Sequence, residues 1–370
     1  MEYLNNPTVY ELLMDDISNE LRQNITEKLK LLSRNGLIKP NWLEYCKLPD
    51  KPRTPRLYFL KKIHKNPIGI RPIVSSVNSI TEPISQFVDK WLQTYVHKLP
   101  SYLKDSTQFI NLIESQTLPQ DCLLASIDVS SLYTNIPHNE GVQSVLHFLS
   151  HDPEAYKLPE QPIPEVLAEL VDIVLKNNVF EFNNQYYLQI QGTAMGTKMA
   201  PAYANLFMGK LEEKLIHTGK QHILMWKRFI DNIIFIIWTG SHTEFSEYMT
   251  EINKLHNTIK FTHEINNTEL TFLDVTLYKG TRFHRRNILD IRTHIKPTNK
   301  QLYVHASSYH PPSILAAISK GETHRYLRTN SDENNFHEMT LNLVHRLKHR
   351  GYKQSKILKH VNELNSTTDL

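Results

Sequence analysis

Two apolar segments separated by only two residues constrain the fold of this chain most strongly. Residues 223–230 and 233–238 are rich in apolar and aromatic side chains, and Asp231-Asn232 lies between them. Strands joined by so short a connection pair as an antiparallel hairpin, and Asp and Asn are favoured in such turns. The pattern therefore predicts a β-hairpin whose tip carries Asp231 and Asn232.

A second apolar segment ends close to another carboxylate. Residues 123–129 form an apolar run with Asp128 near its end, and Ser130 and Ser131 follow. An unpaired charge in an apolar strand is costly, so such an aspartate either caps the strand or binds a cation. The same two alternatives apply to Asp231, because aspartate is also an ordinary turn residue. The positions of the two aspartates leave both alternatives open.

Apolar periodicity elsewhere predicts helices as well as strands, and therefore an α+β fold. Helices are expected at residues 1–50, 81–96, 137–149, 162–176, 201–215 and 245–255, and from about residue 311 onward. Further strands are expected at residues 180–190 (a hairpin that turns at Asn183-Asn184), 258–265, 270–278 and 289–295. No change of composition marks a flexible linker, so these elements are expected to form subdomains of one body.

Charge is distributed unevenly along the 370 residues. The formal net charge is only +4, but residues 281–370 contain 15 basic and 7 acidic side chains. Residues 51–71 contain seven basic side chains and no acidic one, interleaved with Tyr58, Phe59 and Ile63. Each basic stretch is either a solvated face or a surface that binds a polyanion, and nucleic acid is the natural candidate.

Several classes of protein are excluded by composition. The chain has two cysteines and no C-x-x-C motif, which argues against a disulfide framework and favours a reducing compartment. Its longest apolar run is far shorter than the roughly 20 residues of a membrane span. The N-terminus lacks the pattern of a signal peptide. We expect an intracellular protein, nuclear or cytoplasmic, with no membrane partner; the sequence does not indicate an oligomeric state.

Five motifs occur in a fixed order along the chain. They are Ile63-His-Lys65, Arg71-Pro-Ile-Val-Ser-Ser76, residues 126–137 around Asp128, residues 191–201 from Gln191 to Pro201, and Phe229-Ile-Asp-Asn-Ile-Ile-Phe235. With these motifs, the chain resembles the reverse transcriptases of Penelope-like retroelements, which are relatives of telomerase reverse transcriptase. The resemblance extends from about Leu57 to Tyr278.

The resemblance implies a right-hand polymerase fold with fingers, an antiparallel-sheet palm and a helical thumb. The expected divisions are an N-terminal helical extension at 1–50, fingers at 51–122, a palm at 123–280 and a basic helical thumb at 281–370. The implied activity is RNA-directed DNA synthesis, with an RNA template, a DNA primer, the RNA/DNA hybrid and dNTPs as partners.

The same resemblance implies a role for each aspartate. Asp128, Asp231 and Asn232 match the catalytic positions of the family. Asp128, Asp231 and the backbone carbonyl of Val129 would hold two Mg²⁺ ions, or Mn²⁺ in their place. Nucleotide addition is phosphoryl transfer, which paired divalent cations promote, and Mg²⁺ prefers hard oxygen ligands such as these.

Other residues are assigned to ligands by the same comparison. The expected nucleotide-binding residues are Lys65, Arg71, Tyr133, Gln191 and Gly192. Tyr133 would crowd the sugar 2′ position and favour deoxynucleotides; the alternative is an aromatic that packs after a strand. The expected nucleic-acid contacts are Lys62, Phe272, Leu273, Arg346, Lys348, Arg350 and Lys353. Of these, Phe272 and Leu273 lie in residues 270–279, which resemble the strand pair that grips the primer end. For the four basic residues at the end of the list the alternative is a solvated charged face.

The sequence departs from the family at the hairpin tip. The family has two consecutive aspartates there, whereas the second residue here is Asn232. Asparagine keeps the shape and an oxygen donor but lacks the charge, so metal binding is expected to weaken. Two functions stay open: an active polymerase, or a catalytically impaired remnant that binds RNA or RNA/DNA hybrid. The GIY-YIG nuclease domain that often follows the polymerase in this family is not expected within these residues.

Overall fold

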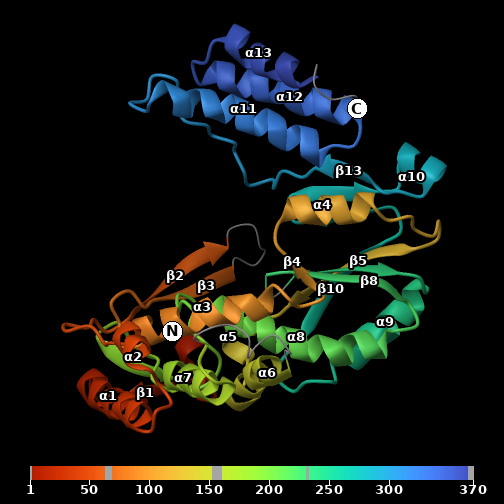
Figure 1. The fold of residues 1–370 in the computed structure, drawn as a ribbon. Helices are drawn as coiled ribbons and strands as arrows, with labels where there is room; N and C mark the ends of the chain where they lie inside the picture. Colours follow the sequence, from red (N-terminus) through yellow and green to blue (C-terminus); the bar gives the residue numbers. More distant parts are fainter. Residues whose placement is uncertain (1, 63–68, 152–160, 231–232, 366–370) are drawn as a thin grey trace.

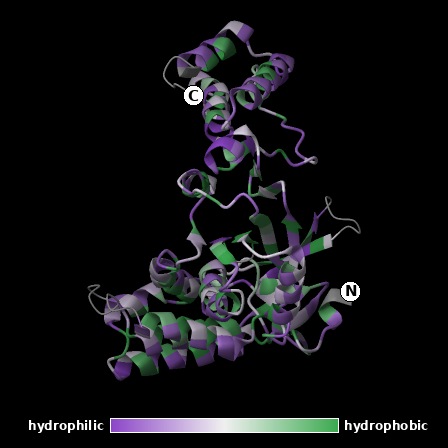
Figure 2. Ribbon diagram, turned by 90° about the vertical axis from the view of Figure 1, so that its right-hand side faces the viewer, coloured by the Kyte–Doolittle hydropathy of each residue, from purple (hydrophilic) through white to green (hydrophobic). Residues whose placement is uncertain are grey.

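The computed structural model describes residues 2–62, 69–151, 161–230 and 233–365. The predicted site residues Lys65, Asp231 and Asn232 lie outside these ranges. Figure 1 shows a larger part that contains most helices and strands, and a group of C-terminal helices above it. The side view in Figure 2 shows the same two parts, joined through a narrow region.

A five-stranded sheet contains the basic segment near residue 60. In spatial order its strands are β1 (Tyr10–Leu13), β7 (Gln185–Gln189), β6 (Val179–Phe182), β2 (Arg56–Lys62) and β3 (Gly69–Ser75). The predicted hairpin at residues 180–190 is confirmed. Its turn residues Asn183 and Asn184 have φ angles of 50° and 60°, which is the left-handed geometry of tight hairpin turns.

Strand β1 shows that the prediction of helix throughout residues 1–50 was wrong. Leu12 and Leu13 pair with Tyr187 and Tyr186 of β7. The segment is extended because of this pairing with residues far along the chain, which no local periodicity could indicate. Helices occupy the rest of the region, as α1 (Ser18–Arg34) and α2 (Pro40–Tyr45).

A second five-stranded sheet contains Asp128. Its order is β10 (Phe261–Asn266), β5 (Leu123–Val129), β9 (Ile233–Trp238), β8 (Ile223–Phe229) and β4 (Tyr102–Leu103). Strand β5 lies between β10 and β9 and is antiparallel to both. The predicted β8–β9 hairpin is confirmed, since Phe229 pairs with Ile233.

Helices cover one face of this second sheet (Figure 1). They are α3 (Glu82–Val96), α5 (Leu132–Asn135), α6 (His138–His151), α7 (Pro164–Lys176), α8 (Ala200–Thr218) and α9 (His242–Ile252). Ile127, Ile234, Ile236 and Trp238 point into the core on this side. Each such buried side chain contributes about 1.5–3 kcal/mol to stability, which holds β5 and β9 in fixed register.

The opposite face of the sheet packs against a third, smaller sheet. The elements on this side are α4 (Ser106–Glu114), β11 (Glu269–Phe272), β12 (Val275–Tyr278), α10 (Thr281–Arg286) and β13 (Asp290–Thr293). Because side chains alternate along a strand, Leu124, Phe235 and Ile237 face this second core. Apolar periodicity predicted one strand over residues 270–278, whereas the resemblance implied a strand pair over residues 270–279. The structure has two strands here, and the chain reverses at Leu273, whose φ is 58°.

The C-terminal helices form a unit with a core of its own. They are α11 (Pro312–Thr329), α12 (Glu333–His349) and α13 (Gln354–Asn365), as the helical pattern after residue 311 predicts. Tyr326, Phe336, Leu347 and Ile357 meet at their centre. In the part of the chain that the structure describes, no helix combines the length and hydropathy required to cross a membrane.

Candidate active site

Asp128 lies near the end of the central strand β5. Its side chain is half-buried, whereas Ile127 and Val129 on either side are buried against the helical layer. Asp128 pairs with Ile233 of β9 and with Thr262 of β10. Ile233 directly follows Asp231-Asn232 in the sequence. The register therefore places Asp128 opposite the residue at which the predicted catalytic turn ends.

The described residues supply part of the predicted metal site. Asp128 has carboxylate oxygens to offer, and the only ligand atom of Val129 would be its backbone carbonyl oxygen, because a valine side chain has no donor atom. No group of three or more His, Cys, Asp or Glu side chains gathers within the described ranges. Oxygen donors alone suit a hard divalent cation, and Asp231 is the further carboxylate that the sequence offers.

Tyr133 and the loop with Gln191 and Gly192 lie side by side. The N–H of Gly192 donates to the carbonyl of Ile136 at 2.9 Å, and the N–H of Thr193 donates to the carbonyl of Tyr133 at 2.6 Å. Tyr133 itself is half-buried in α5. Three of the predicted nucleotide-binding residues are thus brought together, close in sequence to Asp128.

Position 192 requires glycine for two reasons: the backbone is left-handed there, and no space is left for a side chain. The φ of Gly192 is 75°, and a Cβ atom at this position would lie 2.2 Å from the carbonyl oxygen of Tyr133. The ring of His138 donates from Nε2 to the carbonyl oxygen of Gly192 at 2.7 Å. Burial lowers the pKa of His138, so the neutral ring fills this role through its Nε2 proton. Any side chain at position 192 would push the loop away from Tyr133.

The same loop is attached to strand β3. The N–H of Val74 donates to the carbonyl of Met195 at 2.9 Å, and Oγ of Ser76 donates to the carbonyl of Gly196 at 2.6 Å. The φ of Gly196 is 135°, and a Cβ there would lie 2.1 Å from the carbonyl oxygen of Val74. The loop therefore connects strand β3 to helix α5, which carries Tyr133.

Lys62 and Arg71 lie on one face of the β2–β3 hairpin. Arg71 pairs with Leu60, and Lys62 lies two residues further along the same strand, so both side chains project from the same side. Arg71 is exposed and Lys62 is half-buried. The exposed Tyr58 shares this face. Lys65, the remaining predicted fingers cation, lies outside the described residues.

The structure corrects the prediction that Phe272 contacts a primer. Its side chain is 1% exposed and packs against Phe109 and Phe235, with ring centroids 4.7 and 5.4 Å apart. A side chain enclosed in this core has no surface to offer a nucleic acid. Leu273 is half-buried at the turn that follows, and its contact with a primer stays a prediction.

Comparison with known proteins decides the family. A family profile described as "Reverse transcriptase (RNA-dependent DNA polymerase)" matches residues 63–276, more than half of the chain. The chain belongs to the reverse transcriptase family. Telomerase reverse transcriptase of Oryza sativa subsp. japonica is 33% identical over 84 residues, which are 19% of this chain and 6% of that protein. This reverse transcriptase thus matches only a small part of the curated relative.

Solved structures similar to this reverse transcriptase have the same fold at low identity. Telomerase from Candida albicans, solved with a TWJ fragment of telomeric RNA, has a TM-score of 0.58 and 9% identity, covering 86% of this chain and 60% of that chain. Apo telomerase from Candida tropicalis has a TM-score of 0.50 and 14% identity, and the match covers 95% of this chain and 62% of that chain. The RNA-dependent RNA polymerase of a human picobirnavirus has a TM-score of 0.50 and 12% identity, and the match covers 80% of this chain and 58% of that chain. The chain has the right-hand polymerase fold of these proteins.

The C-terminal part of this reverse transcriptase matches a second profile. Residues 302–362, which include α11, α12 and most of α13, match one described as "Animal helix-turn-helix domain". Of the predicted contacts here, Lys348 and Lys353 are exposed, while Arg346 and Arg350 are half-buried. Nε of Arg350 donates to the carbonyl of Tyr303 at 2.6 Å. Arg350 therefore fixes the segment before α11 in addition to any role toward a ligand.

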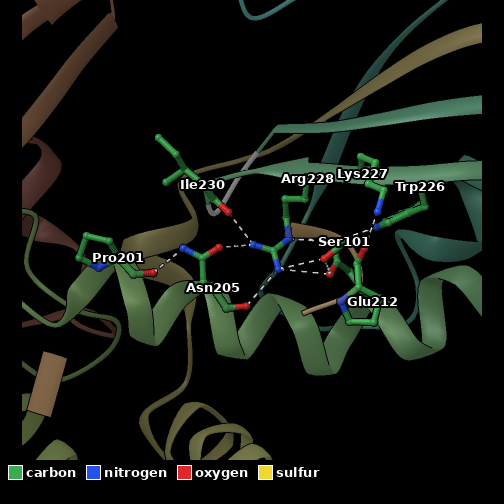
Figure 3. Close-up of polar contacts among 9 residues, drawn as sticks. Ser101, Pro201, Asn205, Glu212, Trp226, Lys227, Arg228 and Ile230 are labelled. Atoms are coloured by element: carbon green, nitrogen blue, oxygen red, sulfur yellow. Dashed lines mark hydrogen bonds and ion pairs between the residues drawn. The ribbon is translucent and has the colours of Figure 1, made fainter. Parts of the chain in front are cut away.

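Sequence reasoning missed the buried polar groups behind the β8–β9 turn of this reverse transcriptase. Arg228 lies in β8, and its partners Glu212 and Asn205 lie in α8 (Figure 3). An arginine next to the apolar residues of a core strand is itself a signal, because a buried charge needs a partner. Nothing in the sequence identified the partners, which belong to a different element.

Proposed function

We propose that this chain is the polymerase part of an RNA-directed DNA polymerase of a Penelope-like retroelement, which extends a DNA primer with dNTPs on an RNA template. The observation that carries the proposal is the register that sets Asp128 opposite Ile233, directly after Asp231-Asn232. Membership of the reverse transcriptase family supports the reaction class. The Penelope-like assignment depends on the five collinear motifs, and we place the protein in the nucleus or the cytoplasm.

Each residue of the site has a chemical role in this proposal. Asp128, Asp231 and the carbonyl of Val129 hold two Mg²⁺ ions, for which Mn²⁺ can substitute. When bound, the ions supply activation of the primer 3′-hydroxyl and stabilisation of the leaving pyrophosphate. Lys65 and Arg71 bind the triphosphate by charge. The family's remaining nucleotide contacts fall on Tyr133, Gln191 and Gly192, which the loop hydrogen bonds hold in one place.

Basic side chains on the fingers and the C-terminal helices bind the nucleic acid. Lys62 lies on the β2–β3 hairpin on the same face as the exposed Arg71, Arg346 and Lys348 lie on α12, and Lys353 lies directly before α13. Contacts of this kind neutralise phosphates without reading sequence, so hybrid binding should weaken steeply as salt is raised.

Asn232 favours a second function. With one carboxylate fewer at the turn, the site has less charge to hold two divalent cations than the family pattern provides. The second proposal is a catalytically impaired protein that keeps the fold and binds RNA or RNA/DNA hybrid.

Primer extension on an RNA template tests the two proposals together. The three proteins to compare are the unmodified chain, Asn232→Asp and Asp128→Ala. We expect Asn232→Asp to extend the primer faster than the unmodified chain and Asp128→Ala to be inactive. Primer extension by Asp128→Ala would contradict the assignment of Asp128 as a ligand of two metal ions. No extension by the unmodified chain, together with tight and salt-sensitive hybrid binding, would favour the impaired protein.

Tyr133 is tested by sugar selectivity in whichever protein is active. Tyr133→Ala is expected to incorporate ribonucleotides more readily, because the ring no longer occupies the space near the 2′-hydroxyl. Tyr309→Ala, at a fully exposed tyrosine before α11, is the matched control. Unchanged selectivity in Tyr133→Ala would contradict the assignment.

A further inference from the structure

A fully buried arginine lies directly behind the turn that carries Asp231. Arg228 is in β8, three residues before Asp231, and its exposed fraction is 0%. Its Nε donates to Oε1 of Glu212 at 2.8 Å, and its Nη2 donates to Oε2 at 3.2 Å (Figure 3). The planar guanidinium is thus bound by both carboxylate oxygens, which fixes its orientation as well as its position.

Glu212 is itself held on all sides. Oγ of Ser101 donates to its Oε2 at 2.6 Å, and Nε1 of Trp226 donates to its Oε1 at 2.9 Å. The backbone N–H of Arg228 donates to the carbonyl of Ser101 at 2.6 Å. A buried polar network with its groups satisfied is rigid. Glu212 already neutralises the charge of Arg228, so the guanidinium does not need a bound anion as its partner.

The remaining end of the guanidinium points toward the turn. Nη1 donates to the carbonyl oxygen of Ile230 at 2.6 Å and to Oδ1 of Asn205 at 2.5 Å. Asn205 is oriented by its own Nδ2, which donates to the carbonyl of Pro201 at 2.8 Å. Figure 3 shows Asn205 and Ile230 on the same side of the guanidinium, opposite Glu212.

The backbone of Ile230 has a left-handed conformation, which isoleucine does not adopt without support from neighbouring residues. Its φ is 55°, and a β-branched residue in the left-handed region is a genuine outlier. Its side chain is 43% exposed, so packing does not account for the conformation. Such backbone geometry persists only where the surroundings determine it, and the hydrogen bond from Arg228 acts on this backbone directly.

The carbonyl of Ile230 belongs to the peptide group that connects it to Asp231. A peptide group is planar, so a hydrogen bond that fixes the carbonyl also fixes the direction in which the chain enters Asp231. Asp128 is fixed separately, by the register of β5 with β9. The hydrogen bond from Arg228 therefore acts on the backbone directly before Asp231.

We propose that Arg228 is a positioning residue for the metal-binding turn. Glu212 and Asn205 hold its guanidinium, and Nη1 holds the carbonyl of left-handed Ile230, which sets where Asp231 is presented to Asp128. This inference rests on the proposed function, because only that function makes Asp231 a metal ligand whose position matters. It predicts a defect in metal binding that a mere loss of packing would not produce.

The main test replaces the ion pair without leaving a buried charge. Arg228→Met combined with Glu212→Leu removes both charges and keeps apolar volume, a change that buried ion pairs often tolerate. The variant loses the hydrogen bond to Ile230. A third change, Ile230→Gly, then provides a residue that adopts the left-handed conformation without steric cost. Neither Arg228 nor Glu212 touches substrate in the proposal.

Metal binding is measured on the full chain by titration with Mn²⁺, followed by electron paramagnetic resonance. Asp128→Ala defines the binding that belongs to the site. The double variant is expected to weaken this binding by about 10–100-fold, the usual effect of removing a residue that orients a metal ligand. Adding Ile230→Gly should restore part of the loss. Unchanged Mn²⁺ binding in the folded double variant, or a loss that Ile230→Gly does not reduce, overturns the proposal.

Amide hydrogen exchange is a second measurement, and it distinguishes a failure of this proposal from a failure of the proposed function. Amide hydrogen exchange of residues 229–233 should be faster in the double variant, while exchange in β5 stays unchanged; equal exchange at 229–233 overturns the positioning role. If neither the unmodified chain nor Asn232→Asp shows Mn²⁺ binding that depends on Asp128, the metal assignment of the proposed function fails. The exchange result then still decides whether Arg228 holds the turn.

Two single variants decide the question if the double variant does not fold. Asn205→Ala removes a contact at the Nη1 end, next to Ile230, and Ser101→Ala removes a contact at the Glu212 end. The proposal expects faster exchange at residues 229–233 in Asn205→Ala than in Ser101→Ala. The reverse order, or equal exchange in the two variants, overturns it.

Discussion

Two hairpins of this reverse transcriptase reverse the chain with the same local pattern but are held by different contacts. In the β8–β9 hairpin Phe229-Ile230 precedes Asp231, and in the β11–β12 hairpin Phe272-Leu273 precedes Asp274. Ile230 and Leu273 are both left-handed, with φ angles of 55° and 58°. A bulky residue needs outside support in this conformation, so the source of that support distinguishes the two turns.

The first turn is held by a residue buried between the second sheet and its helices, and the second turn forms an ion pair with the C-terminal helices. Arg228, which contacts Ile230, is fully buried with Glu212. Asp274 instead pairs with Arg325 of α11 at 3.5 Å, and the two side chains are 37% and 36% exposed. A buried pair is protected from solvent, whereas an exposed pair is screened. Among the contacts that the structure describes, the first turn is thus held from within its own sheet and helix layer, and the second turn is linked to the C-terminal unit.

The largest expected effect is the loss of one member of the buried pair. Glu212→Leu leaves Arg228 charged and unpaired in the core, which should lower the free energy of unfolding by about 3–5 kcal/mol. Urea denaturation of the two proteins measures it. The matched change on the exposed pair, Asp274→Leu, should cost about 1 kcal/mol or less. Equal losses in the two variants would contradict the distinction between the turns.

The next effect concerns the phenylalanine that precedes each turn. Phe272 is fully enclosed in the second core, whereas Phe229 is half-buried. Phe272→Leu should lower the free energy of unfolding by about 1–3 kcal/mol, within the usual range for core substitutions, and Phe229→Leu should cost less. The same urea experiment compares them. A larger loss in Phe229→Leu would show that the first turn depends on apolar packing more than on Arg228.

The comparison also shows which parts of the fold the sequence could predict. The β8–β9 hairpin and the turn at Asn183-Asn184 were predicted because apolar runs and turn residues are local signals. The β11–β12 reversal followed from the family resemblance and not from periodicity, because the apolar run continues through Leu273 and only Asp274 is a turn residue. Strand β1 was missed because only its pairing with β7 makes it a strand.

The candidate site was predictable to the extent that its residues belong to motifs. Asp128, Tyr133 and Gly192 were identified from their neighbours in sequence, and the structure places Tyr133 beside Gly192. Phe272 also lies in a motif, but a motif does not state whether a side chain is exposed. Arg228 and Glu212 are 16 positions apart and lie in different elements, so only the folded chain shows that they form a pair.

The smallest effect tests the nature of the link between the β11–β12 turn and the C-terminal helices. Arg325→Met removes the ion pair to Asp274, and the loss in free energy of unfolding should be about 1 kcal/mol or less at low salt. At roughly 1 M NaCl the loss should nearly vanish, because the Debye length is then about 3 Å. Urea denaturation at both salt concentrations measures this, with Arg328→Met on the same helix as the control. A loss that persists in high salt would mean that the stem of Arg325 is held by packing, and that the second turn resembles the first more closely than its exposed pair indicates.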